Sequence, residues 1–84
     1  MTRYIVRTRP KSLDAVTLLG AEHSEEIARA IVKACDCEMT HFQPATRLSP
    51  MTILCDAKDK TAIARIVRCL DLLGPVRSES AEVP

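Results

Sequence analysis

The feature that most constrains the fold is the ordered pattern of residues 50–83. A nearly continuous apolar run, Met51–Asp56, comes first, and apolar residues then recur at helical spacing through Ala57–Leu73. Gly74-Pro75 ends that helix, because glycine accepts a left-handed terminal position and proline cannot continue the helix. Val76–Ser80 follows as a second extended segment. The pattern therefore predicts a strand, a helix and a strand.

The helix of this unit has two further marks. Asp59 is expected to be its N-cap, because a carboxylate can accept a hydrogen bond from a free amide of the first turn. Its buried stripe is expected to consist of Ile63, Ile66, Val67, Leu70 and Leu73.

The first half of the chain predicts a matching unit. Leu13–Leu19 favours a buried strand because of its β-branched residues, although a short helix closed by Gly20 stays open as an alternative. Ser24 is expected to cap a helix over Glu25–Cys35, and Cys37–Gln43 alternates like a strand. The apolar face of this helix is expected to hold Ile27, Ala30, Ile31 and Ala34.

Together the two units predict a βαββαβ order. Right-handed crossovers convert this order into an antiparallel sheet with both helices on one face, an α+β domain of the ferredoxin-like type. Residues 1–84 are expected to form one such domain. Arg3–Thr8 also alternates charged and apolar residues, so residues 1–11 are expected to add an extra basic N-terminal strand or an arm.

The composition excludes several classes of function. The 84 residues carry a net charge of +1, so no global field attracts nucleic acid or a membrane surface. Tyr4 and Phe42 are the only aromatic residues. Neither lies on Leu13–Leu19 or Met51–Asp56, the two strands predicted to be central in the sheet, which argues against base stacking. No apolar run approaches the roughly 20 residues of a membrane span. Because the N-terminus has no apolar signal-peptide region, a cytoplasmic location is expected.

One local charge asymmetry is present. Arg3, Arg7, Arg9 and Lys11 all precede the first acidic residue, Asp14. These charges can protect an exposed edge strand from pairing with another chain. Alternatively, they are partner-binding residues that contact an acidic protein or a phosphate.

The four cysteines are expected to be free thiols. Cys35, Cys37 and Cys55 should lie near one end of the sheet, and Cys69 should lie at the opposite end. Zinc sites usually begin with two cysteines separated by two to four residues, but only Asp36 separates the first two. Burial as small hydrophobic residues is the main prediction, and a redox or regulatory role stays open.

No catalytic, metal-binding or cofactor-binding constellation is predicted. His23 and His41 lie on different elements, and neither has an adjacent carboxylate or nucleophile in sequence. Gly20 and Gly74 are the only glycines, too few for a phosphate-binding loop. The chain is therefore not expected to be an enzyme.

The second half resembles the effector domain of the Lrp/AsnC transcription regulators, and ACT domains share the pattern. The residues concerned are Met51–Lys60, Ile63–Arg68 and Leu73–Ser80, and the earlier elements line up in order. The resemblance implies a twofold pairing of sheets with a ligand near the loop before Met51. The residues of this chain that would bind the ligand there are Thr46, Arg47 and Ser49. The family's Gly-x-x-Asp segment and its DNA-reading domain have no counterpart in the chain.

These observations predict a stand-alone, non-enzymatic sensor or effector module. It is expected to form a homodimer, because a four-stranded sheet with both helices on one face leaves apolar groups uncovered on the other face. A small ligand is expected at the subunit interface. The alternative is an adaptor or inhibitor that docks on an acidic protein through its basic N-terminal strand.

Overall fold

A computed structural model describes residues 1–12, 23–46 and 48–84. They form six elements, in the order β1 (Thr2–Pro10), α1 (Ser24–Ala34), β2 (Glu38–Gln43), β3 (Met51–Ala57), α2 (Lys60–Asp71) and β4 (Val76–Glu82). The predicted α+β class is confirmed.

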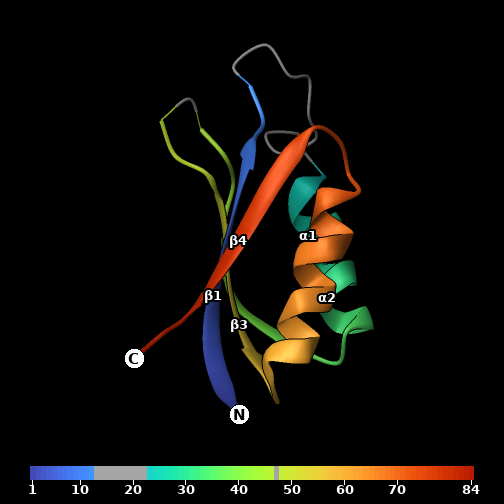
Figure 1. Ribbon diagram of the computed structural model, residues 1–84, viewed down its shortest axis with the longest axis vertical. Helices are drawn as coiled ribbons and strands as arrows, with labels where there is room; N and C mark the ends of the chain where they lie inside the picture. Colours follow the sequence, from blue (N-terminus) through green and yellow to red (C-terminus); the bar gives the residue numbers. More distant parts are fainter. Residues whose placement is uncertain (13–22, 47) are drawn as a thin grey trace.

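The four strands form one antiparallel sheet in the order β2-β3-β1-β4. Both helices lie on one face of this sheet, and no other described element covers the opposite face, which we call the open face (Figure 1). This arrangement is compatible with a ferredoxin-like fold. β3 is a central strand, as its continuous apolar character predicts.

The prediction for the N-terminal segment is wrong in one respect. Residues 2–10 form neither an arm nor an extra edge strand, because β1 pairs with β3 on one side and with β4 on the other. β1 therefore takes the place in the sheet that was predicted for Leu13–Leu19. That predicted strand lies outside the described residues. The error arose because Leu13–Leu19 is the more apolar segment, whereas β1 alternates arginines with buried residues.

The core lies between the sheet and the helices and is mainly aliphatic. β1 contributes Tyr4 and Val6, while β3 contributes every second residue from Met51 to Ala57. Of the predicted stripe on α2, Ile63, Ile66 and Leu70 are buried, while Val67 and Leu73 pack partly against the core. Thr8 and Ser78 are also buried, and their hydroxyl oxygens form a hydrogen bond of 2.8 Å, which satisfies both polar groups.

Local signals explain where α2 begins and where α1 ends. The Asp59 side chain accepts a hydrogen bond from the amide of Ala62 at 3.0 Å, which confirms the predicted N-cap of α2. α1 closes in a Schellman motif, in which the amides of Asp36 and Cys37 donate to the carbonyls of Lys33 and Val32. Asp36 holds the required left-handed conformation, with φ of 57°.

Three further details of the first half differ from the predictions. α1 buries Ala28 and Val32, whereas Ala30 and Ala34 are exposed, because apolar residues lie on several sides of this helix. In β2 a register shift between Met39 and His41 disrupts the simple alternation. Met39 and Phe42 consequently both pack against the core. α1 also begins at Ser24 itself, with His23 in the N-cap position.

The burial of Ile66 gives a direct test of the helix assignment. Ile66 is fully buried on α2, so Ile66→Ala should lower the free energy of unfolding by about 2–4 kcal/mol through lost burial and the cavity left behind. Lys60→Ala, at an exposed position of the same helix, is the control and should change it by less than about 0.5 kcal/mol. Urea unfolding measures both. Equal losses would mean that the buried face of α2 is assigned wrongly.

Candidate binding surface on the open face of the sheet

The open face of the sheet displays most of the basic side chains predicted to contact a partner. Alternation along β1 directs Tyr4, Val6 and Thr8 toward the helices, so the intervening residues project from the opposite face. These are Arg3, Ile5, Arg7 and Arg9. Because β1 is a central strand, the arginines cross the middle of the open face and do not line its edge.

Arg3 lies at one end of this face and is already paired. Its Nε donates to Oδ1 of Asp56 at 3.0 Å, and its Nη2 donates to Oδ2 at 3.5 Å. Asp56 lies directly opposite Arg3 on β3. This hydrogen bond and the attraction between the two charges raise the pKa of Arg3 above its usual value. The Arg3 charge is therefore largely neutralised within the molecule.

The other end of the open face carries an excess of positive charge. Arg9 lies directly opposite Arg77 of β4, and Arg7 lies directly opposite Glu79. The only described carboxylate paired with Arg9 is that of Glu79, at 3.6 Å from Nη1. Lys11 follows β1 immediately, and we call Arg7, Arg9, Lys11 and Arg77 the basic corner.

A pocket of about 440 Å³ lies within the basic corner. Its walls are formed by Arg9, Pro10, Lys11, Arg77 and Glu79. The three cations and one carboxylate among these described residues give the walls a net charge of +2. The amide of Lys11 donates to the carbonyl of Pro75 at 2.8 Å, which ties the end of β1 to the start of β4. This arrangement suits the binding of an anion.

Sequence reasoning found three members of the basic corner and missed Arg77. A signal was present, since Arg77 and Glu79 alternate with buried residues of β4. The partnership of Arg77 with Arg9 depends on the register between strands that are distant in sequence. Sequence alone did not specify that register. The structure separates Arg3, which was predicted to act with the others, by its pairing with Asp56.

The predicted ligand-binding loop uses the hydroxyl group of Thr46 in a local turn. Oγ1 of Thr46 accepts hydrogen bonds from the amides of Leu48 at 3.3 Å and Ser49 at 3.0 Å. The Thr46 amide in turn donates to the carbonyl of Ser49. Thr46 therefore stabilises its own loop. Arg47, the third residue predicted for this site, lies outside the described residues.

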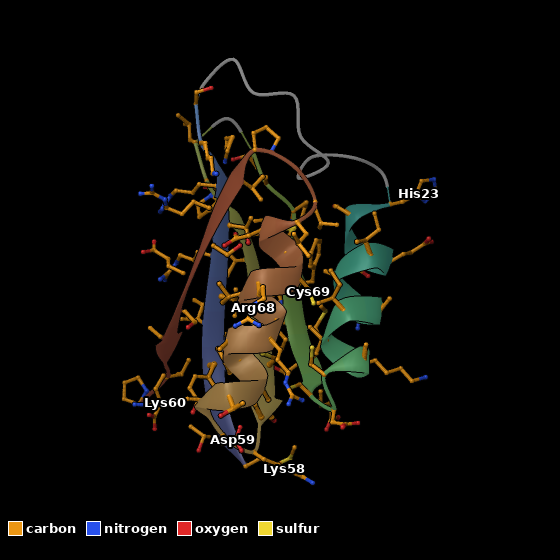
Figure 2. All side chains as sticks on the ribbon, turned by 45° about the vertical axis from the view of Figure 1, so that its right-hand side comes forward. His23, Lys58, Asp59, Lys60, Arg68 and Cys69 are labelled. Atoms are coloured by element: carbon orange, nitrogen blue, oxygen red, sulfur yellow. The ribbon has the colours of Figure 1, made fainter. Side chains whose placement is uncertain are left out.

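The two histidines are not brought together. His23 lies at the start of α1, where its Nδ1 is 3.5 Å from Oε2 of Glu26, a pairing that the sequence analysis did not anticipate (Figure 2). Both side chains of that pair are largely exposed. His41 is exposed on β2, opposite Leu54. Exposure leaves neither imidazole in a water-excluded site of the kind that general acid–base catalysis uses.

The cysteines are closer together than predicted. All four are free thiols, and Cys55 is fully buried. Cys69 is not at the opposite end from Cys35, because its thiol lies close enough to contribute to the raised pKa of the Cys35 thiol. Helical side chains tilt toward the N-terminus of their helix, which brings Cys69 down the side of α2 that faces α1 (Figure 2). The described residues include no group of three His, Cys, Asp or Glu side chains placed to hold a metal ion.

Comparison with known proteins does not identify a family for this chain. No family model, no curated protein and no solved structure matches the chain significantly. The resemblance to Lrp/AsnC effector domains therefore stays a prediction. Within the part of the chain that the structure describes, neither helix is long and apolar enough to cross a membrane.

Burial makes three of the four thiols, those of Cys35, Cys37 and Cys55, poor nucleophiles. Burial raises the pKa of the Cys55 thiol to about 11, and it also raises the pKa values of Cys35 and Cys37. Since the thiolate is the reactive form, less of it is present near neutral pH than in an ordinary cysteine. In the native protein at pH 7.5, Cys55 should resist iodoacetamide, whereas all four thiols should react in urea. Peptide mass spectrometry reads the sites, and rapid native labelling of Cys55 would contradict its burial.

Proposed function

We propose that the protein is a non-enzymatic binding module whose open sheet face docks on an acidic protein partner. The observation that supports this most strongly is the basic corner, where Arg7, Arg9, Lys11 and Arg77 gather and the one described ion pair is that of Arg9 with Glu79. Cations gathered on one face of a protein of nearly zero net charge steer an acidic partner and fix its orientation.

A protein partner is favoured over a nucleic acid. Single-stranded nucleic acids are usually held by aromatic side chains on which the bases stack. The two aromatic residues of this chain are Tyr4 and Phe42, and both pack in the core on the helix side of the sheet. Base stacking on the open face would therefore have no aromatic platform.

We further propose the ferredoxin-like topology and a reducing, cytoplasmic location. The strand order β2-β3-β1-β4 supports the first proposal. The four free thiols support the second, since disulfides are rare in reducing compartments. We also propose the relationship to Lrp/AsnC effector domains that the sequence resemblance implies.

Binding of an acidic probe tests the proposed function. A fluorescein-labelled octaglutamate peptide should bind the protein at about 0.02 M salt and be released at about 0.5 M, because exposed charges are screened. Arg77→Ser should weaken binding about two- to fivefold, since one exposed ion pair contributes about 0.2–1 kcal/mol. Fluorescence anisotropy measures the affinity.

Arg68→Ser is the matched control for this experiment. Arg68 is exposed on α2, in the helix layer, so this substitution removes the same charge from another surface (Figure 2). Its affinity for the peptide should stay within twofold of the wild-type value. Equal weakening by both substitutions would show that only total charge matters. No binding at low salt would refute the proposal.

A homodimer that pairs open faces is a second candidate, with a small ligand at the seam. Ile5 and Leu54 are cross-strand neighbours on this face and are only partly buried, and Ala81 lies beside Ile5. This apolar strip supports the candidate. The strip is narrow, because the exposed side chains of Arg3 and Arg7 flank Ile5 on the same face of β1.

If the strip pairs with its copy, light scattering should give twice the chain mass at micromolar concentration, in high salt as well as low salt. Ile5→Lys should dissociate the dimer, because it places like charges at the seam. A monomer at hundreds of micromolar would refute the dimer and its intersubunit ligand together.

A further inference from the structure

The pocket of the basic corner contains an electrostatic conflict. Arg9 and Arg77 are direct cross-strand partners, and like charges in that position destabilise a sheet. Glu79 relieves the conflict only in part. Its contact with Arg9 is 3.6 Å long, and both side chains are more than half exposed. An anion bound between the two guanidinium groups would remove the repulsion.

The charge of the pocket matches a dianion better than a single carboxylate. Among the described residues, its walls carry three cations and one carboxylate, a net charge of +2. A phosphate monoester carries about −1.5 to −2 charges near neutral pH and presents three acceptor oxygens. Arginine side chains bind phosphate through two parallel N–H donors, a geometry that lysine cannot supply.

The backbone around the pocket is well fixed. Pro10 lies opposite Val76, and the Lys11 amide is bonded to the carbonyl of Pro75. The prolines restrict their own φ angles, so the ends of β1 and β4 need little reorganisation to receive a ligand. Glu79 also has another cation beside it, because Arg7 is its direct cross-strand partner. When the phosphate binds Arg9, the Glu79 carboxylate can form an ion pair with Arg7 instead.

We infer that this pocket is a subsite for a phosphate monoester carried on a side chain of the partner. The inference rests on the proposed function, since the rest of the open face would contact acidic residues around the phosphorylated one. Arg9 and Arg77 would bind the phosphate oxygens from two sides, and Lys11 would supply the third positive charge.

Three labelled peptides test this inference on the wild-type chain. They share the same flanking glutamates and differ only at the central residue, which is phosphoserine, glutamate or serine. The phosphoserine peptide should bind about tenfold more tightly than the serine peptide and at least about threefold more tightly than the glutamate peptide. Because the comparison uses only the wild-type protein, it does not depend on the folding of any variant.

Two substitutions separate the effect of the paired arginine donors from the effect of positive charge. Arg77→Lys keeps the charge but loses the paired donors, so it should reduce the preference for phosphoserine at least threefold while changing the affinity for the serine peptide less than twofold. Arg68→Ser should leave the preference unchanged. Circular dichroism verifies that each variant is folded.

The outcomes separate this inference from the proposed function. If all three peptides bind with equal, salt-sensitive affinity, the phosphate subsite is refuted and the acidic docking surface stands. If none of them binds, both are refuted. Competition by free phosphoserine or by a single-stranded oligonucleotide at the concentration effective for the phosphopeptide would overturn the assignment to a partner's side chain.

Discussion

The backbone of β1 pairs along both of its edges, and the rest of the structure depends on this double pairing. β3 and β4 fix its register, so alternate side chains must point to opposite faces. The side chains of Val6 and Thr8 are buried in the core, while those of Arg7 and Arg9 are exposed to solvent. A slip of one residue would bury the arginines and expose the core residues. The cost of burying unpaired charge therefore specifies one register strongly.

The same register determines where charge gathers on the open face. At one end, Arg3 meets Asp56 and the two charges cancel. At the other end, Arg9 meets Arg77, and Glu79 is the single described carboxylate available to the corner. An antiparallel sheet with one solvated face is stable without a partner when that face is polar, so this surplus charge is not needed for folding. Folding therefore depends on the helix side of the sheet, and the basic corner is the surface that we propose for binding.

The sequence allowed the second half of the fold to be predicted because its signals are local. The Asp59 cap and the stripe through Ile66 each involve residues within a few turns of one another. The failures concern information that is not local. The central role of β1, the proximity of Arg77 to Arg9 and the approach of Cys69 to Cys35 all depend on pairing or packing between distant segments.

Within the candidate site, alternation along the N-terminal segment identified Arg7 and Arg9, but it could not place them at the centre of the sheet. The loop around Thr46 was selected by family resemblance, whereas its hydroxyl serves a local turn. The mainly aliphatic core agrees with a composition that includes only two aromatic residues. That composition carried no information about which strands would be neighbours.

Native-state hydrogen exchange by NMR tests the central placement of β1 most directly. If β1 lies between β3 and β4, the amides from Tyr4 to Thr8 should be among the slowest to exchange, with opening free energies that approach that of global unfolding. The outer strand β2 should exchange faster. Exchange of Tyr4–Thr8 at the rate of an unstructured peptide would contradict the account, because an N-terminal arm could not fix the arginines against Arg77 and Glu79.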